Sequence, residues 1–249
     1  MIRMIALFVV FLILPTLGYA AEPSTLAIDF NLPNVNDAEP GQVATVLQVL
    51  AVLTVLSLAP ALLIALTAFT RIIIVLSMLR FAFGMQQTPP NTVLISLALF
   101  LTLFTMMPVI KQMESQALNP YLAGELDASI AVTEAVNPLR EFMIRQTKEK
   151  DLAMVLDMQD GPPPEDFADI TNVTLVTAFM LSELQTAFQI GFVIFLPFLL
   201  VDLVVASVLM SMGMIMVPPL TLSLPIKILM FVLIDGWSLV AHSLVGSFL

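Results

Sequence analysis

The sequence predicts an all-α protein inserted in a membrane, with four hydrophobic, kinked helical segments arranged as two hairpins around a small helical periplasmic domain. Two observations carry this prediction. Hydrophobic residues make up 59% of the chain and charged residues only 11%, far below the ~25% of a typical soluble domain. Four long runs also contain no charge, and their lengths approach or exceed the ~20 residues that cross a bilayer as a helix.

Residues 1–20 have the features of a cleaved secretory signal peptide. Arg3 supplies a positive charge, and the apolar run Met4–Leu14 is too short to span a bilayer. Small residues precede a cleavage site at Ala20. An uncleaved short anchor is the alternative. Cleavage leaves residues 21–42 as an extracytoplasmic N-terminal loop, rich in proline, asparagine and acidic residues.

The first hydrophobic helical hairpin is predicted over residues 43–110. Two runs, Gln42–Thr70 and Phe81–Ile110, contain no charged residue, and each exceeds the ~20 residues of a membrane-spanning helix. Arg71 and Arg80 lie between these runs. Because the mature N-terminus is expected outside the cytoplasm, both arginines are expected on the cytoplasmic side, in agreement with the positive-inside rule.

Residues 111–173 are predicted to form a periplasmic helical domain. Residues 111–170 hold twelve acidic and five basic residues, so most of the chain's net charge of −10 belongs to this insert. Asn137 followed by Pro138 predicts the start of a helix, and apolar residues then continue at helical spacing until Gly161 ends it. The resulting apolar stripe suits packing against a neighbour.

The second hydrophobic helical hairpin, with a methionine-rich loop, is predicted over residues 174–249, where Pro218 and Pro219 divide two segments. Further prolines predict kinks or breaks in the hydrophobic segments, at Pro60, Pro108, Pro197 and Pro225. Backbone groups freed by a break are tolerated at membrane depth only inside protein or beside a water-filled cavity. The bundle therefore indicates part of an assembly that encloses a path.

Residues with catalytic or metal-binding chemistry are scarce. The absence of cysteine excludes disulfides, thiol catalysis and thiolate metal sites. His242, the only histidine, has no metal-binding partner nearby in the sequence and is interpreted as a packed or interfacial residue. No hydrolase, zinc-protease, P-loop or dinucleotide motif occurs. We predict that the protein is not an enzyme and has no catalytic residue, cofactor or metal, and its acidity argues against nucleic acid as a partner.

The informative residues are charges inside apolar runs. Asp202 follows 18 uncharged residues, and 24 more separate it from Lys227. A charge at the bilayer centre costs about 2.5–3.5 kcal/mol, so such groups usually pair or face water. Asp202 and Lys227 either line a conduit or form a structural ion pair. Glu183 lies near the end of a predicted segment and is a third candidate buried charge, or an interfacial residue.

Methionines occur at every second position from Met210 to Met216. This spacing is not that of a helical stripe, since alternate helical residues point in nearly opposite directions. An extended backbone would place all four methionines on one face. Their flexible, adaptable side chains suit a surface that seals and then conforms to varied partners. Ordinary packing inside an apolar helix is the alternative.

Several ordered blocks of this sequence carry a resemblance to a known family. They are Leu66–Val75, Pro89–Asn91, Leu181–Phe192, Pro197–Asp202, Gly213–Pro219, Leu224–Lys227 and Val232–Trp237. From about residue 43 to the C-terminus the chain resembles the FliP/SctR family of export-gate subunits, which flagellar and virulence type III secretion systems share. The predicted signal peptide is similar to that of the flagellar branch.

The resemblance implies a multi-pass protein of the bacterial inner membrane, partly periplasmic and part of the flagellar basal body. The implied partners are several copies of the chain itself, as a pentamer, FliQ-like and FliR-like subunits, other export-apparatus proteins, membrane lipid and the unfolded flagellar proteins that are exported. It also implies that Met214, Ile215 and Met216 form a gasket that closes the channel, with Met210 and Met212 as further candidates for the lining. Ile215 departs from the family's all-methionine version.

Two other classes of function compete with an export gate. Broken helices with isolated charges are also typical of a secondary transporter or an ion channel subunit, and an assembly scaffold fits the hydrophobicity equally well. Transporters often contain paired repeats around a midplane substrate site. Residues 43–110 and 174–247 share no repeat beyond the form of a hairpin, which favours the gate.

Overall fold

The computed structural model describes residues 40–85, 87–159, 167–214 and 216–248. The chain divides into two units, Met1–Leu56 and Ser57–Leu249. The described part of the first unit is the N-terminal portion of helix α2 (Pro40–Leu66). The predicted signal peptide, most of the predicted N-terminal loop and Gly161 lie outside the described residues.

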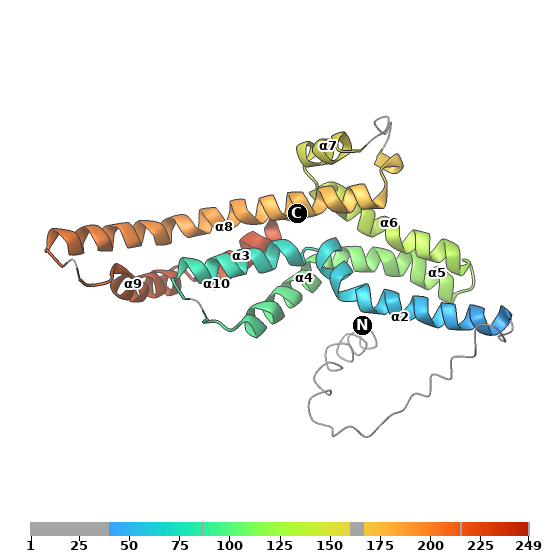
Figure 1. Ribbon diagram of the computed structural model, residues 1–249, viewed down its shortest axis with the longest axis horizontal. Coiled ribbons are helices and arrows are strands. Elements are labelled where there is room, and N and C mark those ends of the chain that lie inside the picture. The colour runs from blue at the N-terminus through green and yellow to red at the C-terminus, as the bar shows by residue number, and fades with distance from the viewer. Residues whose placement is uncertain (1–39, 86, 160–166, 215, 249) are drawn as a thin grey trace, which may run out of the picture. The chain divides into compact units, whose positions relative to one another are not determined.

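The predicted all-α class is confirmed: every regular element in the described ranges is a helix (Figure 1). Two short irregular turns accompany the α-helices, a π-helical turn at Glu114–Leu118 and a 3₁₀ turn at Phe167–Asp169. After α2 the helices are α3 (Phe69–Ala82), α4 (Asn91–Met113), α5 (Asn119–Leu122), α6 (Ala128–Gln146), α7 (Glu149–Asp157), α8 (Asn172–Ser211), α9 (Pro219–Leu233) and α10 (Gly236–Gly246).

Several helices are long and apolar enough to cross a membrane. Three qualify within the described residues: Val49–Leu66, Asn91–Leu122 and Asn172–Ser211. Helices α9 and α10, bent by 67° at their junction, qualify as a fourth only if taken together. The helices run through Pro60, Pro108, Pro197 and Pro225 without ending there, so none of these prolines breaks its helix, and the alternative of a kink stays a prediction.

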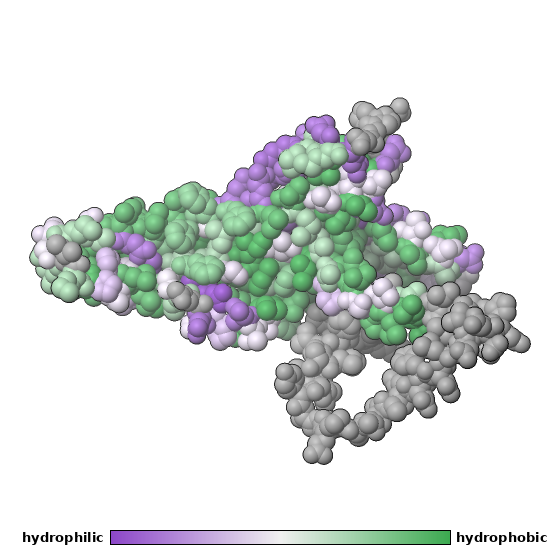
Figure 2. Space-filling view, in the orientation of Figure 1, coloured by the Kyte–Doolittle hydropathy of each residue, from purple (hydrophilic) through white to green (hydrophobic). Residues whose placement is uncertain are grey.

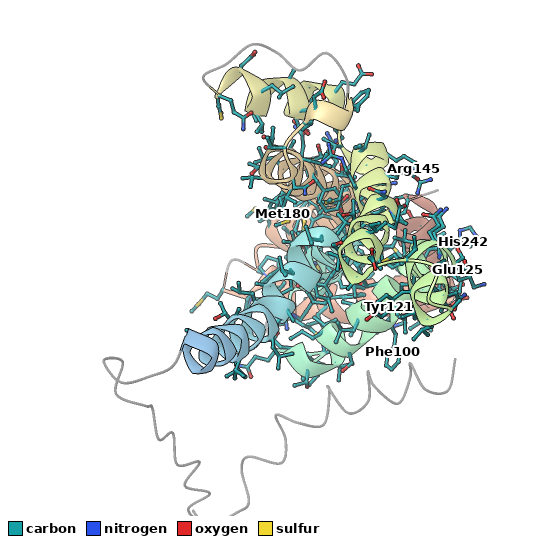
Figure 3. All side chains as sticks on the ribbon, turned by 90° about the vertical axis from the view of Figure 1, so that its right-hand side faces the viewer. Phe100, Tyr121, Glu125, Arg145, Met180 and His242 are labelled. Carbon is teal, nitrogen blue, oxygen red and sulfur yellow. The ribbon has the colours of Figure 1, made fainter. Side chains whose placement is uncertain are left out.

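The surface of these helices is strongly apolar. Hydrophobic residues cover most of the visible face of α8, whereas hydrophilic residues gather over α7 (Figure 2). On α4, Phe100 is 69% exposed and points away from the helix that carries it (Figure 3). Because a soluble monomer rarely exposes so much contiguous apolar surface, lipid or other subunits must cover it.

The first hairpin turns after Arg80, at the stretch that contains Gly84, Pro89 and Pro90. The stretch between Arg71 and Arg80, expected as the link between two membrane segments, is the body of helix α3. The turn instead occupies residues 83–90, between α3 and α4. Arg71 is tolerated inside α3 because its buried guanidinium pairs with a carboxylate of another helix. The positions of charge-free runs in the sequence do not reveal such a pair.

Helix α3 packs most extensively on α8. Ile72, Leu76 and Leu79 recur at helical spacing on the buried face of α3. The two helices approach closely because position 191 of α8 is glycine: a Cβ atom there would lie only 2.2 Å from the Met78 sulfur. This contact fixes the crossing point of the two helices.

The long helix of the insert does not begin where the sequence predicts. The Asn137–Pro138 helix start is wrong, because α6 begins ten residues earlier, at Ala128, and contains Pro138 in its interior. An interior proline costs about 3 kcal/mol, which burial of Pro138 and the neighbouring Phe142 offsets. The helix then breaks at Lys148, whose extended backbone N–H donates to Ser182 Oγ of α8 at 3.0 Å.

Candidate functional site: the methionine loop and two buried ion pairs

The methionine-rich segment forms the tip between α8 and α9. Helix α8 ends in a Schellman motif, in which Gly213 N–H donates to the Met210 carbonyl and Met214 N–H to the Leu209 carbonyl, both at 3.0 Å. Gly213 adopts φ +75°, a left-handed conformation that favours glycine. The single extended face expected for the four methionines is therefore wrong, because Met210 is helical and Met212 caps the helix.

All four methionines are nevertheless exposed. The exposed fractions are 71% for Met210, 63% for Met212, 44% for Met214 and 97% for Met216. Ile215 lies outside the described residues. Packing within this chain therefore does not explain the methionines, and the apolar tip is available to another surface.

The structure brings Asp202 and Lys227 together. Lys227 Nζ lies 2.6 Å from Asp202 Oδ2 and donates to the Ala82 carbonyl at 3.0 Å. The Lys227 side chain is 2% exposed, whereas that of Asp202 is 32% exposed, and Asp202 Oδ1 has no hydrogen-bond partner. This ion pair ties α8 and α9 to each other and to the end of α3.

A second ion pair joins α3 and α8. Both Arg71 Nε and Nη2 donate to the Glu183 carboxylate, the former at 2.9 Å. Arg71 is 2% exposed and Glu183 fully buried, so Glu183 is not interfacial. A two-pronged guanidinium–carboxylate contact is the strongest ion-pair geometry that proteins use.

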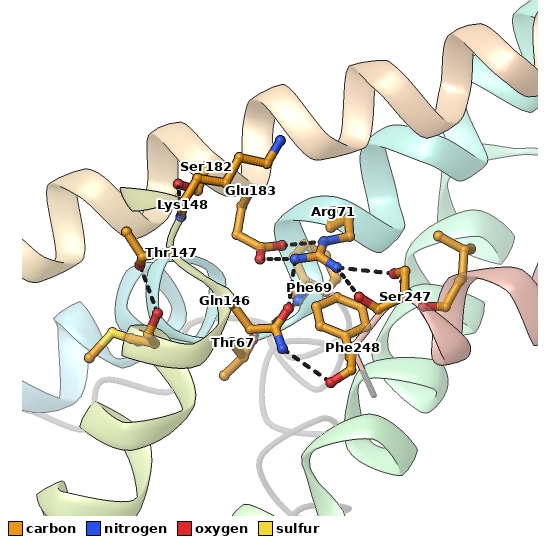
Figure 4. A network of polar contacts seen from close by, with 12 residues as sticks. Thr67, Phe69, Arg71, Gln146, Thr147, Lys148, Ser182, Glu183, Ser247 and Phe248 are labelled. Carbon is orange, nitrogen blue, oxygen red and sulfur yellow. Dashed lines mark hydrogen bonds and ion pairs between the residues drawn. The ribbon is translucent and has the colours of Figure 1, made fainter. Parts of the chain in front are cut away.

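The remaining donors of Arg71 bind the end of the insert and the C-terminal segment (Figure 4). Arg71 Nη1 donates to the Ser247 carbonyl at 2.8 Å, and Nη2 donates to Gln146 Oε1 at 3.0 Å. The Phe248 ring covers the guanidinium at 3.8 Å, and the Phe248 carbonyl accepts from Gln146 Nε2 at 3.1 Å. Four distant parts of the chain thus meet at one buried cation.

This network changes the interpretation of the arginines. Arg71 was expected on the cytoplasmic side and Gln146, in the insert, on the periplasmic side. Two residues joined by a hydrogen bond of 3.0 Å cannot lie on opposite sides of a membrane. Because Arg71 is buried and neutralised by Glu183, it carries no positive-inside signal, and only Arg80 remains as evidence for a cytoplasmic turn.

His242 lies on the exposed side of α10 (Figure 3). Within the described ranges, no group of three or more histidine, cysteine or acidic side chains is arranged to hold a metal ion.

Arg71 is the important residue that sequence reasoning missed. The signal was present: Arg71 follows 31 uncharged residues and Glu183 precedes 18, the same kind of isolation that singled out Asp202 and Lys227. Opposite charges at the borders of apolar runs are candidates for pairing, whatever their separation in sequence.

Comparisons with known proteins identify the family of the chain. A model of the FliP family matches residues 52–244, a range that includes both ion pairs and the methionine loop. The flagellar biosynthetic protein FliP of Bacillus subtilis (strain 168) is 50% identical over 213 residues, which are 86% of this chain and 96% of that protein.

Two other relatives extend the match. The flagellar biosynthetic protein FliP of Caulobacter vibrioides is 46% identical over 229 residues, which cover 92% of this chain and 85% of that protein. The protein of the same name from Borreliella burgdorferi is 38% identical over 248 residues, or 97% and 98% of the two chains. The chain therefore belongs to the FliP family.

Proposed function

We propose that the chain is a subunit of the flagellar type III protein export gate. Several copies, as a pentamer, assemble with FliQ-like and FliR-like subunits into the channel through which unfolded flagellar proteins cross the bacterial inner membrane. Family membership supports the flagellar part of this proposal, and the helices long enough to span a membrane support the location.

The observation that carries the proposal is the exposed methionine tip between α8 and α9. A ring of copies brings one such tip from each copy to a common axis, where Met214, Ile215 and Met216 bury one another. A dry apolar constriction excludes water and ions without filling the channel with backbone. Methionine side chains are unbranched and adapt to irregular surfaces, so the same ring yields to a passing polypeptide.

The apolar exterior supports assembly with further subunits. Large apolar side chains on α8 remain exposed through the helix, including Phe188, Phe192, Leu196, Leu200 and Leu203. Their spacing of three and four residues places all five on one face of the helix. An isolated chain leaves this surface without a partner, whereas neighbouring copies, small hydrophobic subunits and lipid cover it together.

The pairing of Asp202 with Lys227 weakens the transporter alternative. That alternative depended on isolated charges that bind a solute or an ion at membrane depth. Lys227 instead has a carboxylate partner at 2.6 Å and a carbonyl acceptor at 3.0 Å, and it is buried. Its charge holds α8 and α9 to α3, and it is not free for a substrate.

Copurification tests the proposal. Two copies of the chain carrying different tags are coexpressed with FliQ-like and FliR-like subunits, extracted in mild detergent and purified through one tag. We expect the other tag and both small subunits in the same complex, with more than one copy of this chain per complex. A monomer that excludes both partners, or saturable uptake of a small solute by the chain alone in vesicles, contradicts the gate.

A further inference from the structure

Four helices of the second unit carry equal numbers of cations and anions, whereas the apolar helix α4, which carries Lys111, is counted separately. Helices α3, α8, α9 and α10, with the link between the last two, carry three cations and three anions. Two cations pair with two anions inside the chain. The six residues are Arg71, Arg80, Glu183, Asp202, Lys227 and Asp235. Pairing leaves one cation, Arg80, and one anion, Asp235.

Arg80 has only neutral partners. Its Nη1 donates to Asn91 Oδ1 at 2.6 Å and to the Pro89 carbonyl at 3.3 Å. Its Nε is buried and has no acceptor. The guanidinium lies 5.6 Å from the Phe81 ring centroid. The half-buried guanidinium therefore has no anionic partner among the described residues, and at least one of its five N–H donors is unused.

Asp235 is exposed, and its carboxylate has no partner among the described residues. It adopts φ +50°, the left-handed conformation that aspartate tolerates better than most residues. The following Gly236 is packed so tightly that a Cβ atom would lie 2.2 Å from the Phe231 ring. The 67° bend between α9 and α10 thus holds the backbone of Asp235 in place and leaves its carboxylate exposed. The Asp235 side chain does not cap α10.

The two unpaired charges flank one aromatic cluster. Phe83, three residues after Arg80, meets Phe231 edge-on at 4.9 Å between ring centroids. Phe231 in turn meets Trp237, two residues after Asp235, at 5.4 Å. Arg80 and Asp235 therefore lie at neighbouring levels of the helical bundle, without contacting each other.

We propose that Arg80 of one copy pairs with Asp235 of the adjacent copy in the assembled ring. A ring is built from head-to-tail contacts, in which one patch of each copy meets a different patch of the next. A charge pair across such an interface takes its cation from one patch and its anion from another patch of the same chain, and the pairing within α3, α8 and α9 leaves one of each. A lipid phosphate neutralises Arg80 but not Asp235, whereas a second copy neutralises both.

The proposal rests on the multi-copy assembly proposed above, and crosslinking tests it in a chain that contains no cysteine. Copies with Arg80→Cys and copies with Asp235→Cys, carrying different tags, are coexpressed and treated in membranes with a short bis-maleimide. We expect a crosslinked dimer that contains both tags. Arg80→Cys coexpressed with a cysteine at the exposed Asp157 of α7 is the matched control and should give no dimer.

Charge exchange supplies an independent measurement. Arg80→Glu and Asp235→Arg should each reduce copurification of differently tagged copies several-fold, and the double variant should restore most of it. If wild-type copies copurify but the crosslink between positions 80 and 235 does not form and the double variant does not restore copurification, the proposed pair is wrong and the proposed function stands. Equal crosslinking of the Asp157 control, or crosslinking to a different subunit, also overturns the pair. Failure of wild-type copies to copurify overturns the proposed function instead.

Discussion

Replacing Asp202 with asparagine probes the ion pair that fixes α8 and α9 to α3. The change removes the anionic partner that Lys227, an ammonium whose side chain is 2% exposed, has among the described residues. The Ala82 carbonyl and the amide oxygen of the new asparagine are neutral acceptors. Removing one partner of a buried pair destabilises a protein by about 3–5 kcal/mol, because the other charge stays buried without compensation.

The reverse change should cost less. Lys227→Met leaves a carboxylate whose side chain is 32% exposed, so water screens the remaining charge and the expected loss is about 1–3 kcal/mol. The double variant removes both charges and keeps similar side-chain volumes. Its stability should therefore be closer to that of the wild type than the stability of Asp202→Asn is.

The assay follows the fluorescence of Trp237 during heating of the detergent-solubilised protein. The sequence holds one tryptophan, and its ring lies 5.4 Å from that of Phe231. For a chain of this size about 2–4 °C of melting temperature corresponds to 1 kcal/mol, so Asp202→Asn should lower the midpoint by about 6–20 °C. Asp157→Asn, at an exposed acid of α7, is the matched control. Additive losses in the double variant would refute the reasoning.

Three further predictions test other parts of the structure. Arg71→Lys keeps the charge but loses the two-pronged contact with Glu183, so the melting midpoint should correspond to a loss of about 1–3 kcal/mol; an unchanged midpoint contradicts the network. Gly191→Ala should destabilise by about 1–3 kcal/mol through its clash with Met78, and adding Met78→Ala should restore much of this loss; a double variant no more stable than Gly191→Ala contradicts the contact. A cysteine at the exposed Gln159 should react with an impermeant thiol reagent in whole cells, and labelling only after lysis contradicts a periplasmic insert.

The sequence predicts the hydrophobic segments well because burying a charge in a membrane is costly, so that membrane segments contain long runs without charged residues. The candidate pair Asp202 and Lys227 was also visible, since two opposite charges stand alone on either side of one turn. Glu183 and Arg71 are separated by 112 positions, and no local pattern connects them. Their contact depends on how α3 crosses α8, which only the packed structure supplies.

Local patterns misled where tertiary packing outweighs propensity. Asn137–Pro138 has the residues of a helix start, yet α6 continues through it because burial compensates the interior proline. At the methionine loop, the spacing of two suggested an extended chain. The structure instead ends α8 through the left-handed Gly213, which separates Met210 and Met212 from Met214 and Met216. The exposure of all four was not predictable from spacing.

The central claim is that the methionine loop closes a channel built from several copies. Its most direct test is ion leakage in cells that express the assembled gate with Met214, Ile215 and Met216 all replaced by alanine. Shorter side chains cannot fill the constriction, so we expect normal copurification of subunits together with a marked rise in permeability to small ions. Met158→Ala, at an exposed methionine of the insert, should not leak. A triple variant that assembles normally and admits no ions, or one that dissolves the complex without any leak, would contradict the account.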